Sequence, residues 1–161
     1  MKKEKLFDDR KTIKQVEEST SFAPKFDASG LIPVITSDFK SNEILMQGYM
    51  NKKALKKTIR LGEAVYYSRS SKKLWHKGKT SGFIQKIKEI LIDDDQDCLW
   101  LRVNVKGGAS CHVGYRSCFY RKVPFGKSIK NNTKLILKFS ETKKIFNPSK
   151  VYGNKPSPTK L

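Results

Sequence analysis

The residues with the clearest chemical character form a short run of carboxylates and a thiol, Asp93-Asp94-Asp95-Gln96-Asp97-Cys98. Cys111 and Cys118 follow downstream, and His112 is next to the first of them. In a chain with a net charge of +19, this density of acid and sulfur indicates cation binding. Carboxylate oxygens favour a hard ion such as magnesium, and thiolates favour zinc. The segment is therefore compatible with two different metals.

The composition indicates one domain with a strongly basic surface. The chain has 161 residues, with 34 lysines and arginines against 15 acidic residues. Such a balance suits phosphorylated small molecules or nucleic acid, and a generally lysine-rich proteome produces it without any function. Three cysteines cannot all pair, so clustered thiols indicate metal ligands, catalytic groups or core residues in a reducing compartment. No apolar run suits a signal peptide or a bilayer span, so we expect a soluble, cytoplasmic protein without a membrane partner.

The hydrophobic pattern predicts the elements that must position these residues. Residues 6–18 have the spacing of a short amphipathic helix. Residues 31–35 and 44–50 are predicted to be paired strands, with Pro33 directing the first toward a sheet edge. Asn51 and Gly62 are suitable caps for a helix over residues 52–61.

The second half of the chain is predicted to be mostly strand. Residues 64–67 are strand-like, 68–73 form a polar turn, and 74–82 have the composition of a site loop. Residues 83–92 and 99–105 are predicted strands with the acidic run as the hairpin turn between them. A last strand is predicted over 117–123, and residues 135–139 suit a strand or a helical turn. Residues 147–161 have a disordered composition.

Several short motifs follow one another over about residues 26–122. They are Phe26-Asp27-Ala28-Ser29-Gly30-Leu31-Ile32-Pro33; Ile44-Leu45-Met46 with Tyr49-Met50-Asn51; Ser68-Arg69-Ser70; Leu74-Trp75-His76-Lys77-Gly78 with Thr80-Ser81-Gly82; the acidic run; and Cys111-His112-Val113-Gly114 with Arg116-Ser117-Cys118-Phe119-Tyr120. In this order they resemble the phosphoribosyl-AMP cyclohydrolase family, hydrolases of histidine biosynthesis that open an adenine ring. We accordingly expect an N-terminal extension over 1–25, the family domain over 26–123, and a basic, partly disordered extension over 124–161. We expect a monofunctional chain, because the short basic tail is unsuited to a fused pyrophosphohydrolase.

The resemblance implies a compact α+β fold, mostly antiparallel β-sheet with one main helix, in an intertwined homodimer. It also implies one zinc ion per subunit, magnesium, and a small-molecule nucleotide substrate phosphorylated at both ends, with no nucleic-acid partner. Zinc-activated water would break the N1–C6 bond of the adenine ring. If the family's arrangement holds, one zinc ligand comes from the partner subunit.

The metal residues are carried over where the motifs match. Asp93, Asp95 and Asp97 resemble the family's magnesium site. Cys111 and Cys118 match two of its three zinc thiolates, whereas the commoner family form has its remaining cysteine where this chain has Asp94. A tight loop at 95–97 would place residues 94 and 98 about 5 Å apart across the ladder, so Cys98 is predicted as the third thiolate. A buried Cys98 with Asp94 as the ligand is the alternative.

The only two histidines of the chain, His76 and His112, both lie in matched motifs. We predict His76 as the proton shuttle and His112 as a fourth zinc ligand or a neighbour of the ligands, which the sequence cannot separate. Phosphate and purine binding is predicted for a further set, in which arginine, lysine and hydroxyl groups supply donors and Trp75 supplies a stacking surface. The set comprises Ser68, Arg69, Ser70, Trp75, Lys77, Thr80, Ser81 and Arg116, with Arg121 as a further donor.

A second interpretation is a small, basic, zinc-stapled protein that binds nucleic acid. Clustered cysteines, a high pI and aromatic residues among basic ones favour it. However, the chain lacks the four-ligand pattern of a structural zinc finger, and its acidic run would repel a phosphate backbone.

Overall fold

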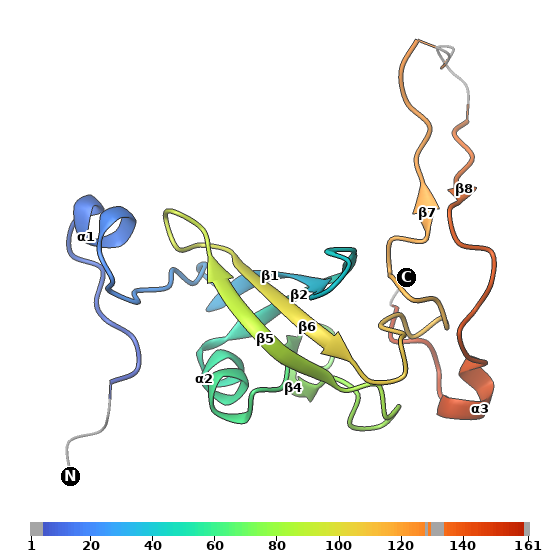
Figure 1. Ribbon diagram of the computed structural model, residues 1–161, viewed down its shortest axis with the longest axis horizontal. Coiled ribbons are helices and arrows are strands. Elements are labelled where there is room, and N and C mark those ends of the chain that lie inside the picture. Colours follow the sequence, from blue (N-terminus) through green and yellow to red (C-terminus); the bar gives the residue numbers. More distant parts are fainter. Residues whose placement is uncertain (1–4, 128, 130–133, 160–161) are drawn as a thin grey trace.

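The main sheet of the protein has four strands in the order β2-β1-β6-β5 (Figure 1). The computed structural model describes residues 5–127, 129 and 134–159. The four strands are β1 (Leu31–Asp38), β2 (Ile44–Asn51), β5 (Gln85–Ile92) and β6 (Leu99–Val105). β1 and β6 run parallel, and the other neighbours are antiparallel. The predicted α+β class with mostly antiparallel strands and few helices is confirmed.

The predicted pairing of the first two strands is confirmed, but the edge position of the first is wrong. β1 lies inside the sheet, between β2 and β6. β6 pairs with β1 only from Val34 onward, and Pro33 precedes that ladder and lies opposite Tyr49 of β2. The missing N–H of the proline therefore leaves the β1–β6 hydrogen bonds intact.

The predicted helix over residues 52–61 is confirmed as α2 (Lys52–Leu61). The Asn51 side chain accepts a hydrogen bond from the Ala54 N–H at 2.8 Å. Gly62 ends the helix in the left-handed conformation, with φ 65°, and its N–H donates to the Thr58 carbonyl. Both caps are local in sequence, which is why the pattern was sufficient to predict them.

The hydrophobic core lies on one side of the sheet, where α2 and a second hairpin cover it (Figure 1). That hairpin comprises β3 (Val65–Ser68) and β4 (Lys73–His76). Alternate residues of β1, Ile32 and Val34, point into this core and are fully buried. The opposite face of the sheet is less covered and carries half-exposed apolar side chains, including Ile35 and Trp100.

The segment predicted as a site loop over 74–82 is in part a strand. Residues 74–76 belong to β4, where Trp75 pairs with Tyr66 and His76 pairs with Val65. The loop proper begins at Lys77. The structural reason is the partner strand β3, whose pairing is not visible in the composition of the segment itself.

The acidic run forms the β5–β6 turn as predicted, but in a different register. Ile92 pairs with Leu99, and the Asp93 N–H donates to the Cys98 carbonyl at 3.2 Å. Asp93 therefore faces Cys98 across the end of the ladder, and the predicted facing of Asp94 and Cys98 is wrong. Gln96, with φ 59°, makes the turn one residue longer than assumed.

The N-terminal helix is shorter than predicted. α1 spans Ile13–Glu18, and its Ile13 side chain is exposed. The residues before it form neither helix nor strand, and Phe7 among them reaches the core and packs edge-on against Phe22 at 5.3 Å.

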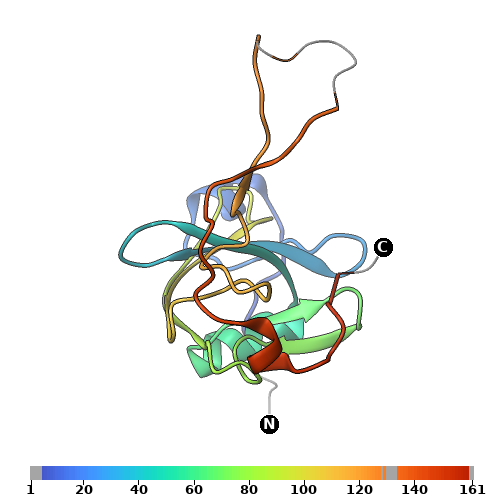
Figure 2. The same ribbon diagram turned by 90° about the vertical axis from the view of Figure 1, so that its right-hand side faces the viewer.

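The C-terminal part contains β7 (Arg121–Lys122), β8 (Lys138–Phe139) and α3 (Pro148–Tyr152). Of the strand predicted over 117–123 only β7 forms, because Ser117 is buried and donates to the Ile44 carbonyl instead of joining a ladder. The chain around β7 and β8 projects from the body as an arm (Figure 2). The partial disorder predicted for residues 124–161 stays a prediction. Among the described residues of this segment, the Ile145 N–H donates to the Gly114 carbonyl at 2.8 Å, which attaches the segment to the loop after β6.

Among the described residues, no helix is sufficiently long and apolar to cross a membrane.

Two glycines with positive φ provide a test of this packing. A Cβ at Gly78 would lie 2.3 Å from the backbone of Phe83 and Ile84, whereas a Cβ at Gly62 would meet nothing within 4 Å. We expect Gly62→Ala to lower the free energy of unfolding by about 1 kcal/mol through backbone strain alone. Gly78→Ala should cost at least about twice as much, because the loop must also move. Urea denaturation of both variants measures the difference, and equal losses would contradict the placement of the loop.

Candidate active site

The loop after β6 brings two of the three cysteines together. The Cys118 N–H donates to the Leu45 carbonyl at 2.7 Å, which fixes the loop on β2. The Cys111 and Cys118 side chains are neighbours, and the Cys118 thiol lowers the pKa of Cys111 to about 6. The same contact raises the pKa of Cys118, since a thiol next to a thiolate retains its proton. The pair thus presents one thiolate and one thiol, a donor set that suits a soft ion such as zinc.

Lys77 lies beside this thiol pair and is only 4% exposed. Its Nζ donates to the Ser110 carbonyl at 2.6 Å and lies 5.1 Å from the centre of the Trp75 ring. Burial lowers the pKa of Lys77, and the two cysteines oppose that effect. The sequence predicted this lysine as a phosphate donor; the structure places it where its charge faces the thiols.

A chain of buried hydrogen bonds connects the thiol loop to the sheet. Thr36 Oγ1 contacts the Tyr66 hydroxyl at 2.7 Å, Tyr66 donates to Gln85 Oε1 at 2.8 Å, and Gln85 Nε2 donates to Ser110 Oγ at 3.1 Å. Burial raises the pKa of Tyr66, so its phenol stays protonated and can donate. Sequence reasoning missed these residues, and the only available signal was the glutamine at the start of an apolar strand.

The two histidines lie in different surroundings. His76 Nε2 is 2.8 Å from Glu63 Oε2, a carboxylate that follows the C-cap of α2 and that sequence reasoning missed. His112 is next to Cys111. Burial lowers the pKa of His112, and the positive charge of Lys77 lowers it further. His112 Nε2 also lies 3.5 Å from Ser157 Oγ of the C-terminal extension. The carboxylate partner makes His76 the better oriented of the two for proton transfer.

The predicted phosphate and purine residues of the β3–β4 hairpin lie at its accessible edge. Ser68 and Ser70 are 3.3 Å apart at their hydroxyls, and the Arg69 guanidinium lies 4.1 Å from the centre of the Tyr49 ring. Trp75 is 42% exposed and packs against Tyr66 at 5.6 Å. One face of the indole is therefore held by the protein while part of it remains accessible.

The remaining predicted donors differ in how far they are engaged. Thr80 is exposed, and Ser81 Oγ accepts a hydrogen bond from Phe83 N–H at 3.3 Å. Arg116 forms ion pairs with Glu43 and with Asp38, the latter at 3.4 Å. Its guanidinium already has two carboxylate partners and also donates to the Gly108 carbonyl.

The guanidinium of Arg121 lies over the Tyr120 ring, 5.0 Å from its centre. Its predicted role as a further phosphate donor stays a prediction.

The three predicted magnesium ligands converge in the β5–β6 turn. Oxygen atoms of Asp93, Asp95 and Asp97 lie within 4.8 Å of one another. Asp93 Oδ1 accepts hydrogen bonds from the N–H groups of Asp97 and Cys98, both at 2.9 Å, which fix the turn. Three carboxylates on one short turn form a donor set that fits a hard divalent ion. Asp94 is exposed.

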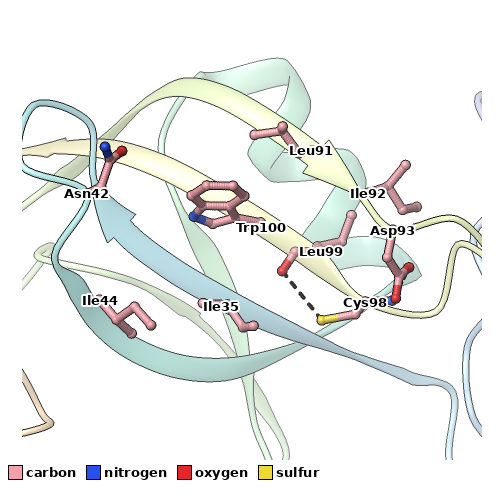
Figure 3. A pocket seen from close by; sticks show the side chains of 9 residues that line it. All are labelled: Ile35, Asn42, Ile44, Leu91, Ile92, Asp93, Cys98, Leu99 and Trp100. Atoms are coloured by element: carbon pink, nitrogen blue, oxygen red, sulfur yellow. Dashed lines mark hydrogen bonds between the residues drawn. The ribbon is translucent and has the colours of Figure 1, made fainter.

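Cys98 lies away from the other two cysteines. It precedes β6, whereas Cys111 and Cys118 follow it, and seven strand residues span roughly 20 Å. Burial raises the pKa of Cys98, and the negative charges of Asp93 and Asp97 raise it further. Its side chain lines a cavity of about 600 Å³ on the less covered face of the sheet, together with Ile35, Ile44, Leu91 and Trp100 (Figure 3). Among the described residues, the three thiols of one chain do not gather into a group that could hold one ion, whereas the three aspartates do.

Comparison with known proteins identifies the family. The family model described as phosphoribosyl-AMP cyclohydrolase matches residues 46–120. A protein of that name from Rhodopseudomonas palustris strain HaA2 is 46% identical over 141 residues, which cover 88% of this chain and 93% of the relative. The chain belongs to the phosphoribosyl-AMP cyclohydrolase family. A further relative of the same name, from Nitrobacter winogradskyi, is 43% identical over 90% of this chain and 97% of its own length.

These matches confirm the family resemblance found in the sequence. They favour a hydrolase of the phosphoribosyl-AMP cyclohydrolase family over the nucleic-acid-binding interpretation. The matched 141 residues exceed the range 26–123, so the relatives share part of the N- and C-terminal extensions.

The state of the thiol pair can be tested in metal-free protein. Because the pKa of Cys111 is lowered to about 6, a thiolate should form as the pH rises through about 6, well below the usual value of 9. We expect the thiolate absorbance at 240 nm to rise by one equivalent per chain with that midpoint. Cys111→Ser should abolish this step, whereas Cys98→Ser should leave it unchanged. A first step near pH 9 in the unaltered protein would contradict the contact between the two sulfurs.

Proposed function

We propose that this chain catalyses the hydrolysis of phosphoribosyl-AMP in histidine biosynthesis. The observation that carries the proposal is its 46% identity to a curated relative of that name over 93% of the relative's length. In the reaction, water oxygen adds to C6 of the adenine ring, and the C6–N1 bond breaks. The oxygen stays on C6 as a carboxamide, and a proton is delivered to N1. The chain must therefore bind the nucleotide, supply a nucleophile and transfer protons.

The thiol pair is the proposed zinc site and the acidic turn the proposed magnesium site. Zinc held by Cys111 and Cys118 would supply hydroxide at neutral pH by lowering the pKa of a water molecule. Asp93, Asp95 and Asp97 would hold magnesium. Lys77, buried next to the sulfurs, balances the negative charge of the thiolate and fixes the Ser110 carbonyl.

His76 is the proposed proton shuttle, with Glu63 as its positioning residue. The carboxylate contacts Nε2 at 2.8 Å, so it fixes the orientation of the imidazole ring for proton transfer. The exposed part of Trp75 lies on the same strand, β4, and offers a flat apolar surface for the purine.

Arg69, with Ser68 and Ser70, is the proposed phosphate site, and Thr80 and Ser81 are the proposed second group of donors. These side chains lie at the accessible hairpin and in the loop after β4. Arg116 is better suited to holding the loop after β6 in place, because Asp38 and Glu43 neutralise its charge.

We also propose that the protein is a homodimer in which Cys98 of one subunit completes the zinc site of the other. The separation of Cys98 from the thiol pair supports this arrangement, since three thiolates can then meet only across subunits. The cavity next to Cys98 is lined mainly by apolar side chains on a sheet face that is less covered in the single chain. A second copy packed there would bury these side chains.

Mixing of inactive variants tests the shared zinc site. Cys98→Ser and Cys118→Ser should each lose zinc and activity as homodimers. After joint refolding, about a quarter of the wild-type activity should return, because half of the dimers are mixed and each contains one complete site. Ring opening is followed by ultraviolet absorbance, and zinc is measured by atomic absorption.

Asp94→Ala is the matched control and should retain zinc. Loss of zinc in Asp94→Ala but not in Cys98→Ser would assign the ligand to Asp94. If mixing restores no activity, the zinc site lies within one subunit and the proposed arrangement is wrong.

The proton-transfer role predicts different effects for the two members of the His76–Glu63 pair. His76→Asn should lower kcat by about 10²- to 10⁴-fold, because no other group replaces its proton transfer. Glu63→Gln retains the shape of the side chain and should lower kcat by a smaller factor. Steady-state kinetics from pH 6 to 9 measures both, and an unchanged kcat in His76→Asn would exclude the assignment.

A further inference from the structure

The N-terminal residues 8–25 lie along the acidic turn of the β5–β6 hairpin (Figure 1). Arg10 Nη2 donates to the Asp95 carbonyl at 2.9 Å, and Arg10 Nη1 donates to the Ala23 carbonyl at 2.8 Å. The sequence predicts residues 1–25 to be an N-terminal extension, and this stays a prediction. The contacts of residues 8–25 make them part of the surroundings of the three carboxylates.

Gln96 makes most of these contacts from the middle of the turn. Its side-chain oxygen accepts from Ala23 N–H at 2.8 Å, and its side-chain nitrogen donates to the Val16 and Ser21 carbonyls at 2.9 and 3.0 Å. Its main-chain carbonyl accepts from Lys25 N–H at 2.7 Å. Gln96 is 4% exposed and has φ 59°, a conformation that residues other than glycine rarely adopt. The hydrogen bonds of the Gln96 side-chain amide therefore hold an unusual backbone conformation between Asp95 and Asp97.

Lys25 places a positive charge against the same carboxylates. Its Nζ lies 3.8 Å from Asp95 Oδ2 and 3.5 Å from Asp97 Oδ2. The lysine side chain is half-exposed, so it can swing into solvent. A divalent ion that binds Asp95 and Asp97 must compete with this ammonium group, because both satisfy the same oxygens.

We propose that residues 8–25 set the divalent-cation affinity of the acidic turn. Gln96 is a positioning residue that holds the carboxylates in a ligand-ready arrangement, and Lys25 is an internal cation that the metal displaces. The inference rests on the magnesium site of the proposed function and adds its regulation by the N-terminal segment. A segment that only caps the hairpin would affect stability without competing for the metal.

Manganese binding to the zinc-loaded full-length protein provides the test, with electron paramagnetic resonance reporting free Mn²⁺ and Mg²⁺ as competitor. Lys25→Gln should tighten Mn²⁺ binding by about 3- to 10-fold, since one competing charge is removed at short range. Lys25→Arg retains the charge and should remain close to the unaltered protein. Lys14→Gln, a matched charge change at an exposed site in α1, should also remain close to it.

Gln96→Met retains side-chain length without the three amide hydrogen bonds. It should weaken Mn²⁺ binding about 10-fold or more, although all three aspartates are present. Lys25 is half-exposed, so its replacement preserves the fold. The Lys25 comparison therefore decides the question even if Gln96→Met lowers the yield of folded protein.

Asp97→Asn separates failure of this inference from failure of the magnesium site. If Asp97→Asn weakens Mn²⁺ binding but Lys25→Gln behaves like Lys14→Gln, the role of the N-terminal segment is wrong and the metal site stands. If Asp97→Asn has no effect, the metal binds elsewhere and both proposals are overturned.

Discussion

The length of β6 separates the two chemically active regions of the chain. The acidic turn with Cys98 precedes this strand, and the Cys111–Cys118 loop follows it; the strand itself is roughly 20 Å long. Among the described residues, the three thiols of one chain do not form a cluster, whereas Asp93, Asp95 and Asp97 do. The parallel pairing of β6 with β1 fixes this geometry in the interior of the sheet, where rearrangement would disrupt the core. The proposed three-thiolate centre would therefore need a second subunit, and metal binding would then be linked to association.

The thiol loop has no regular structure between β6 and β7, yet it is firmly placed. The buried chain from Thr36 through Tyr66 and Gln85 to Ser110 connects it to the sheet core. Lys77 adds a second contact to Ser110, and Arg116 binds the carboxylates of the β1–β2 hairpin. Buried polar groups are costly unless they are paired, so this network specifies one position of the loop. The sulfurs are held by residues from several distant elements.

The sequence was sufficient for several elements whose determining contacts are local. The caps of α2 and the pairing of β5 with β6 depend on neighbouring residues, and both are confirmed. The register of the β5–β6 turn was wrong, because Gln96 in that turn is bound to residues 16–23. The interior position of β1 depends on β6, some sixty residues away, and Pro33 alone suggested the opposite. The clustering of Asp93, Asp95 and Asp97 was visible because one turn contains it, whereas the burial of Lys77 and the Glu63–His76 contact come from tertiary packing. A periodicity argument contains no information about such packing.

A lysine side chain lies at each candidate metal site, and the two lysines differ in how freely their side chains can move. Lys77 is almost fully buried and bound to the Ser110 carbonyl, so it cannot leave when an ion binds to the sulfurs. Lys25 is half-exposed, and its ammonium group contacts the carboxylate oxygens of Asp95 and Asp97 that an ion would use. An ion at the thiols therefore adds its charge to that of a permanent neighbour, whereas an ion at the turn replaces the ammonium group. Binding of an ion at the turn would consequently be an exchange of cations, in which the attached segment of residues 8–25 takes part.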